Sequence, residues 1–126
     1  MDIDKFNSER IELNNRLMAM DPFFSDFGNL DNNAYADGEI PKKYKELTGL
    51  AISIFSKCED CIRYHLQSCQ QAGCSRKEII ESIKIALIGG GSVLFPWARK
   101  TVRLMDRIGF KKSHGYRREE RAEGIL

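Results

Sequence analysis

The chain has 126 residues, of which 42% are hydrophobic and 30% charged, a balance that argues against wholesale disorder and suits one folded domain. Twenty Lys and Arg against eighteen Asp and Glu leave a net charge of +2, too small to indicate nucleic-acid binding. The longest uncharged run, 85–98, contains three Gly and Pro96 and is too short to span a bilayer. The polar amino terminus does not resemble a signal peptide, so we expect a cytoplasmic protein with no nucleic-acid or membrane partner.

Helical periodicity recurs along the chain and strand alternation does not, so the predicted fold class is all-α. Asp4 is the expected cap of the first helix, Asp21-Pro22 begins the second, and Pro41 lies in the first turn of the third. A segment rich in Asn, Asp and Gly predicts a loop. The elements expected in this half are a helix over 4–20, a helix over 21–30, a loop over 31–38 and a helix over 41–55, the last buried on most sides.

Two capping-box patterns, Ser56 to Glu59 and Ser75 to Glu78, predict helix starts in the second half. The run Gly89–Gly91 either ends a helix or allows another backbone to come close. The elements expected here are helices over 56–73, 75–88 and 94–108, followed by a polar, flexible tail over 111–126. The sequence thus predicts one domain over 1–110, a compact bundle of about five to six helices.

Four cysteines lie within 58–74, a cluster too local to connect distant segments by disulfides. Cys58, Cys61 and His65 share one face of the predicted helix, and Cys61 and His65 are i,i+4 neighbours. Two thiols at this spacing can close a disulfide, and the imidazole can accept a thiol proton. The first helical turn favours a thiolate at Cys58, whereas Glu59 and Asp60 oppose it. These residues are the parts of a dithiol redox centre.

Two other interpretations of the cysteine segment stay open at this point. The cysteines could be small core residues, with His65 at the surface. The spacing of Cys58, Cys61, His65 and Cys69 is similar to that of a zinc knuckle, but four side chains on one helical stripe cannot surround a tetrahedral ion, so no metal is expected. Cys69 is expected to pack in the core, and Cys74 to be exposed in a turn.

Several short motifs lie between residues 35 and 100. The pattern Glu-x11-Cys-x2-Cys-x3-His, which is quite specific, falls on Glu46, Cys58, Cys61 and His65. The further motifs are Lys45-Glu46-Leu47, Leu50-Ala51-Ile52-Ser53, Ala72-Gly73, Glu78-Ile79 and Gly89-Gly90-Gly91. Together they resemble one protein family, the alkylhydroperoxidase D-like branch of the carboxymuconolactone decarboxylase superfamily. Without this resemblance, Glu46 would be an ordinary carboxylate in the first turn of a helix.

The resemblance implies an oxidoreductase that reduces hydroperoxides or exchanges disulfides, as an antioxidant peroxidase does, without a metal or organic cofactor. It assigns to Cys61 the attack on a small peroxide substrate, to Cys58 the resolving disulfide, and to His65 and Glu46 the removal of the Cys61 proton. A dithiol or protein reductant is the implied partner. The best-studied members carry a second His between the cysteines, where this chain has two acidic residues.

Two further functions compete with this one. The first is a carboxymuconolactone decarboxylase-type enzyme that acts on a small lactone acid, although that branch typically does without the cysteine pair. The second is a non-catalytic, redox-sensing oligomer that keeps the fold and has lost turnover. Thiol counting after peroxide treatment distinguishes the redox enzyme from the decarboxylase. Turnover with a dithiol donor distinguishes the redox enzyme from the non-catalytic oligomer.

Apolar residues of the last predicted helix recur every three or four positions, the spacing of a seam between packed helices. These residues are Leu94, Trp97, Thr101, Leu104 and Ile108, and the first two helices add Phe6, Leu13, Leu17, Met20, Phe23, Phe24, Phe27 and Leu30. Either set could be satisfied inside one subunit. The resembled family usually forms trimers or hexamers, so a homo-oligomer is expected, a hexamer before a trimer.

Overall fold

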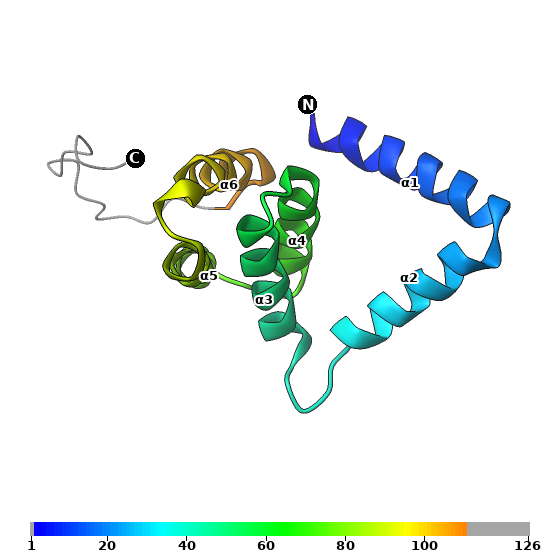
Figure 1. The fold of residues 1–126 in the computed structure, drawn as a ribbon, viewed down its shortest axis with the longest axis horizontal. Coiled ribbons are helices and arrows are strands. Elements are labelled where there is room, and N and C mark those ends of the chain that lie inside the picture. The colour runs from blue at the N-terminus through cyan, green and yellow to red at the C-terminus, as the bar shows by residue number, and fades with distance from the viewer. Residues whose placement is uncertain (1, 111–126) are drawn as a thin grey trace, which may run out of the picture. The chain divides into compact units, whose positions relative to one another are not determined.

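The structure, a computed structural model, describes residues 2–110, which form six α-helices, one short 3-10 helix and no strand (Figure 1). The helices are α1 (Ile3–Met20), α2 (Pro22–Tyr35), α3 (Lys42–Phe55), α4 (Glu59–Gln71), α5 (Arg76–Gly90), η1 (Ser92–Leu94) and α6 (Phe95–Ile108). The predicted all-α class is therefore confirmed. The predicted tail over 111–126 lies outside the described residues.

Contacts divide the described chain into two compact units, one that ends at Pro41 and one that begins at Lys42. The first unit is the helix pair α1 and α2, joined at Asp21, whose side chain accepts a hydrogen bond from the Phe23 N–H at 2.8 Å. Asp2, and not Asp4, caps α1, because its carboxylate accepts from the Asp4 N–H at 3.1 Å. Most apolar side chains of this unit are exposed, including those of Leu13, Met20, Phe23, Phe27 and Leu30.

The loop predicted over 31–38 is wrong for its first half, because α2 continues to Tyr35. Asn and Asp favour turns locally, but neither prevents a helix from continuing, and no Gly or Pro occurs between Gly28 and Gly38. The helix ends at Ala36, which adopts an extended backbone conformation. Local turn preference was thus a poorer guide to this boundary than the absence of a helix breaker.

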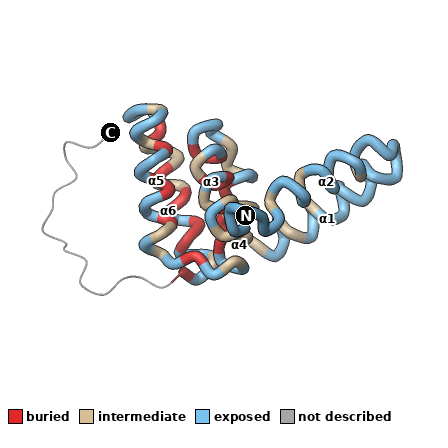
Figure 2. Tube along the Cα trace, turned by 90° about the horizontal axis from the view of Figure 1, so that it is seen from below, coloured by how far each residue is buried: buried red, intermediate tan, exposed pale blue. Residues whose placement is uncertain are grey.

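The second unit is built from α3, α4, α5 and α6 around one apolar core, and Figure 2 shows that the buried residues gather in these helices. The largest fully buried apolar side chains of this core are Leu50, Ile54, Ile62, Leu66, Ile79, Leu94 and Met105. Within α3, one face carries Leu50 and Ile54 into the core, whereas Ile52 and Phe55 are more than half exposed. The expectation that this helix is buried on most sides is therefore wrong.

The run of three glycines ends α5 and allows the next element to approach closely. The helix continues through Gly90, and Gly91 then adopts a φ of 84°, a conformation that favours glycine. A Cβ atom at Gly90 would collide with the side chain of Leu94 in η1. The α6 helix begins at Phe95, one residue after the predicted start, with Pro96 tolerated in its first turn.

Of the two predicted capping boxes, only the one at Ser75 forms. The Ser75 hydroxyl accepts from the Glu78 N–H at 3.1 Å, and the Glu78 carboxylate accepts from the Ser75 N–H at 2.8 Å. This hydrogen bond and the ion pair with Lys43 lower the pKa of Glu78. Ser56 instead donates its hydroxyl to the Ile52 carbonyl oxygen at 2.7 Å, and α4 begins only at Glu59.

Replacement of the two serines by alanine tests this difference. Ser75→Ala removes an acceptor for a helix N–H, so we expect the free energy of unfolding to fall by about 1 kcal/mol. Ser56→Ala removes a hydroxyl that caps no helix, and we expect a change within about 0.5 kcal/mol. Urea unfolding followed by circular dichroism measures both. Equal losses in the two variants would contradict the assignment of the caps.

Candidate functional site

The reversal of the chain between α3 and α4 places the first cysteine. The Cys58 N–H donates to the Ser53 carbonyl oxygen and the Lys57 N–H to that of Ile54, both at 3.0 Å, which is the hydrogen-bond pattern of a Schellman motif. The left-handed residue of the motif is Lys57, with a φ of 58°, where glycine is usual. Cys58 is therefore the last residue of the motif that ends α3.

Cys58 is also the N-cap of α4, because its sulfur accepts a hydrogen bond from the Cys61 N–H at 3.2 Å. The structure joins Cys58 and Cys61 by a disulfide, with their Cα atoms 5.2 Å apart. Cys61 is exposed and Cys58 partly exposed. The two sulfurs thus lie at the beginning of α4, where unpaired backbone N–H groups favour negative charge.

Glu46 of α3 meets His65 of α4 across this reversal. The Glu46 Oε1 atom lies 2.8 Å from the His65 Nδ1 atom, although the two residues are 19 positions apart. Lys42 holds the other carboxylate oxygen of Glu46 at 3.1 Å, and the Glu46 side chain is only 2% exposed. A buried carboxylate requires partners of this kind, because an unpaired charge in the core is strongly unfavourable.

The arrangement determines the chemistry open to the imidazole. An ionised Glu46 can only accept, so His65 donates its Nδ1–H to it and Nε2 becomes the basic nitrogen. His65 also lies on the same face of α4 as Cys61, one helical turn further along. The structure therefore brings Glu46, His65, Cys58 and Cys61 together around the first two turns of α4.

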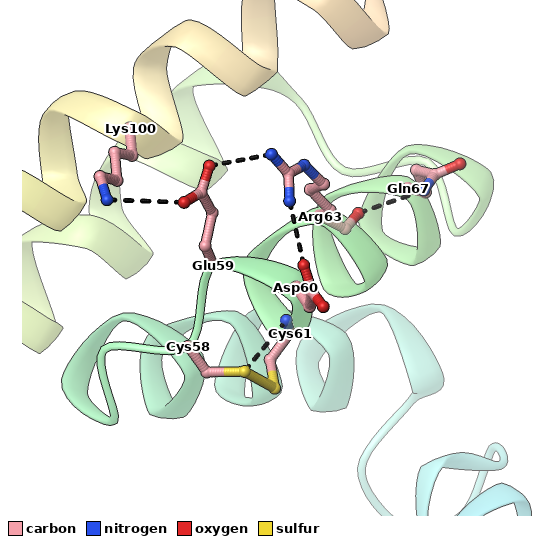
Figure 3. A network of polar contacts seen from close by, with 7 residues as sticks. All are labelled: Cys58, Glu59, Asp60, Cys61, Arg63, Gln67 and Lys100. Carbon is pink, nitrogen blue, oxygen red and sulfur yellow. Dashed lines mark hydrogen bonds and ion pairs between the residues drawn. A yellow bond between two sulfur atoms is a disulfide. The ribbon is translucent and has the colours of Figure 1, made fainter. Parts of the chain in front are cut away.

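The acidic residues between the cysteines are held in ion pairs. Arg63 donates to Glu59 at 2.9 Å and to Asp60 at 3.0 Å, and Lys100 of α6 lies 3.5 Å from the other oxygen of Glu59. Figure 3 shows that the Glu59 carboxylate points away from the two sulfurs, toward Arg63 and Lys100. The ion pairs offset the negative charge that the sequence places beside the thiols.

Three cations at this site were missed by the sequence analysis. Lys42 and Arg63 lie four residues from their acidic partners along their own helices, so the i,i+4 spacing was a usable signal. Lys100 lies 41 positions from Glu59, and no local pattern connects the two. Its ammonium and that of Lys57 also lie over the ring of Trp97, 5.5 and 5.3 Å from the centroid.

The remaining two cysteines are buried, and this corrects the expectation for one of them. Cys69 is fully buried, as predicted, but Cys74 is only 7% exposed although it lies in a turn. Its thiol reaches the Lys43 carbonyl oxygen at 3.6 Å, so α3 covers the turn from a distant part of the sequence. Burial raises the pKa of both thiols, which keeps them protonated at neutral pH.

Residues 2–110 contain neither a metal-binding cluster nor a helix suited to cross a membrane. Among residues 2–110, no group of three or more His, Cys, Asp or Glu side chains is arranged to hold a metal ion. In the same part of the chain, none of the helices combines the length and the apolar character that crossing a bilayer demands.

Comparison with known proteins gives a consistent result. The family model for the carboxymuconolactone decarboxylase family matches residues 21–103. A crystal structure from Thermotoga maritima superposes with a TM-score of 0.78 and 41% sequence identity, covering 82% of this chain and 89% of that one. That protein is described as a carboxymuconolactone decarboxylase family protein for which a part in the antioxidative response has been suggested.

Two more distant proteins are also similar. A carboxymuconolactone decarboxylase family protein from Legionella pneumophila, crystallised in its apo form, superposes with a TM-score of 0.72 at 26% identity, over 83% of this chain and 97% of that one. The uncharacterized protein 4 in the cox locus of Paracoccus denitrificans is 27% identical over 79 residues, which are 63% of this chain and 71% of that protein.

The raised pKa values of Cys69 and Cys74 predict that the protein loses stability in alkali. Above about pH 8.5 the unfolded thiols ionise while the buried ones stay protonated, so the unfolded state is increasingly favoured. We expect the free energy of unfolding to fall between about pH 8 and 10, and to fall less steeply in the Cys69→Ser/Cys74→Ser variant. Urea unfolding across this pH range, with the Cys58–Cys61 disulfide formed in both proteins and Cys69 and Cys74 of the wild type reduced, measures how steeply the free energy of unfolding falls with pH. Identical slopes in the two proteins would contradict the prediction.

Proposed function

The chain belongs to the carboxymuconolactone decarboxylase family, and on this premise we propose that it is a thiol-dependent redox enzyme whose Cys58–Cys61 pair reduces hydroperoxides or exchanges disulfides. The observation that carries the proposal is the 2.8 Å contact between Glu46 of α3 and His65 of α4. His65 lies on the helix whose N-cap and first turn hold the disulfide-bonded Cys58 and Cys61. The suggested antioxidative role of the similar Thermotoga maritima protein supports it.

The reaction begins from the reduced thiols. His65 takes the Cys61 proton at Nε2, and the Cys61 thiolate attacks the terminal oxygen of the hydroperoxide. The O–O bond breaks, the departing oxygen takes the proton from His65 and leaves as an alcohol or water, and Cys61 becomes a sulfenic acid. The Cys58 sulfur attacks this sulfenic acid, the hydroxyl group leaves with the Cys58 proton as water, and the Cys58–Cys61 disulfide forms. An external dithiol then reduces the disulfide and is itself oxidised.

The Glu46 carboxylate acts through His65 in this scheme. It holds the Nδ1–H tautomer and stabilises the imidazolium that forms when His65 takes the proton. Lys42, about half exposed, keeps Glu46 paired when the charge on His65 changes. Glu46 and Lys42 are therefore positioning residues, while Cys61, Cys58 and His65 are the catalytic ones.

The partners follow from the same chemistry. Cys61 is an exposed residue, so the scheme assigns to it a small peroxide substrate and a dithiol or protein reductant, and no metal or organic cofactor takes part. A cytoplasmic location belongs to the proposal, since a reducing compartment keeps Cys69 and Cys74 as thiols and regenerates Cys58 and Cys61.

The central experiment measures peroxide consumption in three parallel assays, with a dihydrolipoyl compound, reduced thioredoxin or glutathione as the electron donor. We expect one donor to be oxidised in step with peroxide loss, and Cys61→Ser to abolish turnover. If the disulfide forms but no donor supports turnover, the protein is a redox sensor and the proposed enzyme activity is wrong. If peroxide leaves all thiols intact and a small lactone acid loses carbon dioxide, the decarboxylase alternative is correct.

Replacement of either relay residue tests the proton path. Glu46→Gln and His65→Gln should slow Cys61 alkylation at neutral pH, and loss of a general base slows the catalysed step by about 10²–10⁴. Asp60→Asn is the matched control, because Asp60 is a carboxylate next to Cys61 that is paired with Arg63 and has no part in the proposed proton path. This substitution should not slow alkylation. Unchanged rates in both relay variants, with folding verified by circular dichroism, would remove these residues from the mechanism.

Assembly into a homo-oligomer is part of the proposal, a hexamer before a trimer. Between α3 and α5 lies an apolar groove of about 370 Å³, lined by residues that include Leu47, Ala51 and Ile85. Ile85 and Ile88 of α5 are 69% and 88% exposed, a large apolar area for a single chain. A second copy that covers this face would remove it from water.

Light scattering at micromolar concentration measures the assembly. We expect a mass several times that of the 14.4 kDa chain. The variant Ile85→Lys/Ile88→Lys should shift the mass toward the monomer, because it places charges on the apolar face. A wild-type mass near that of one chain would overturn the proposed oligomer.

A further inference from the structure

A second pair of cysteines is brought together at the other end of α4. The Cys74 N–H donates to the Cys69 carbonyl oxygen at 2.9 Å, and the Gly73 N–H to that of Gln70 at 3.1 Å. With Gly73 at a φ of 85°, these bonds form a Schellman motif, in which the side chains of the third residue from the helix end and of the second residue beyond the C-cap frequently lie in contact. Here both of these positions are cysteines.

The two cysteines are placed by the apolar core and by α3. Cys69 and Cys74 belong to the same cluster of buried residues, and the Cys74 thiol donates to the Lys43 carbonyl oxygen at 3.6 Å. Cys69 is fully buried and Cys74 is 7% exposed, so only Cys74 reaches the surface. The hydrogen bond between the Cys74 N–H and the Cys69 carbonyl oxygen keeps the two backbones close together, which is the main geometric demand of a disulfide.

We propose that Cys69 and Cys74 form a second redox site, a buried dithiol that a hydroperoxide converts into an intramolecular disulfide. In the first step the Cys74 sulfur takes one oxygen from the hydroperoxide, which is reduced to the alcohol or water. The Cys69 sulfur then attacks the Cys74 sulfenic acid, the hydroxyl group leaves with the Cys69 proton as water, and the disulfide forms. Two thiols are oxidised for each hydroperoxide reduced.

The surroundings determine which sulfur reacts first and how fast. Burial raises the pKa of Cys74 above its ordinary value, and the nearby Glu78 carboxylate raises it too, while the Lys43 ammonium opposes both. Burial also raises the pKa of Cys69, which is the more deeply buried of the two thiols, so Cys74 is the sulfur that meets the oxidant. Both react more slowly than the exposed Cys61, and the second disulfide therefore forms only at higher oxidant exposure.

Oxidation changes the contact between α3 and the turn that follows α4. In the disulfide, Cys74 has no proton to donate, and its hydrogen bond to the Lys43 carbonyl oxygen is lost. Cys74 also lies directly before Ser75, the N-cap of α5. The second disulfide thus connects the end of α4 covalently to the start of α5. This site is independent of the proposed peroxidase activity of Cys58 and Cys61.

The test uses the full chain with Cys58→Ser/Cys61→Ser, so that only Cys69 and Cys74 can react. The protein is treated with increasing hydrogen peroxide, then unfolded for thiol counting, intact mass and peptide mapping. We expect both thiols to disappear together, a mass loss of two hydrogen atoms, and a mapped Cys69–Cys74 bridge. Two intact thiols at every peroxide concentration that leaves the fold unchanged, or oxygen addition at Cys74 with Cys69 still free, would overturn the proposal.

Two glycines of the chain provide a matched comparison in the same background. Gly73→Ala strains the motif that joins the two cysteines, and Gly109→Ala introduces the same strain at the end of α6, where Gly109 has a φ of 95°. We expect a larger share of oxidised Cys74 to become sulfinic acid in Gly73→Ala and an unchanged share in Gly109→Ala. Equal shares in these variants and their parent would show that the motif does not direct the bridge.

Discussion

The reversal of the chain between α3 and α4 requires Lys57 to adopt a left-handed backbone conformation, and the position of every residue of the candidate site depends on it. A non-glycine residue in this conformation costs about 1 kcal/mol, which the packed hairpin has to offset. In return, the turn ends α3 and begins α4 within a few residues. Cys58 consequently stands at a helix start, where its sulfur accepts a backbone N–H.

The same reversal makes α3 and α4 neighbours, and this explains how a carboxylate can be buried beside the cysteines. Glu46 points into the space between the two helices and is satisfied there by His65 and Lys42. The pair is stabilising only as a unit, since removal of either partner leaves a polar group in a dry environment. The geometry that supports a proton path is therefore also a requirement of the fold.

Both ends of α4 bring two cysteines close together by means of a helix-terminal motif, but the environments differ. At the start of the helix, Cys61 is exposed, and Arg63 and Lys100 offset the neighbouring carboxylates. At its end, Cys69 and Cys74 are buried, and burial raises their pKa. The two cysteine pairs thus differ in exposure and in the charges around them, the properties that control the reactivity of a thiol.

The carboxymuconolactone decarboxylase family defines the fold, and the exposed faces suggest how this chain uses it. The α5 helix presents isoleucines to solvent beside an apolar groove, although the chain as a whole carries 30% charged residues. Such a concentration of apolar area on one face differs from the scattered exposed apolar residues of an ordinary monomer. It is consistent with the proposed association of subunits.

The sequence by itself determined the features that depend on neighbours along a helix. The all-α class, the capping box at Ser75, and the common face of Cys61 and His65 follow from periodicity and spacing, because a helix fixes the geometry of residues three or four positions apart. Cys58 does not belong to this group, because it precedes α4 as its N-cap, with an extended backbone, and is joined to Cys61 from there.

Only the tertiary structure decided the contacts between distant segments. Glu46 was identified through the family resemblance, because no rule of spacing connects it with His65 across 19 positions. The burial of Cys74 required α3 to cover a turn that looks exposed in the sequence, and the ion pair of Glu59 required Lys100 from α6. The physical reason is the same in each case: local propensity describes a helix and its ends, whereas the partner of a buried polar group is set by how the helices pack.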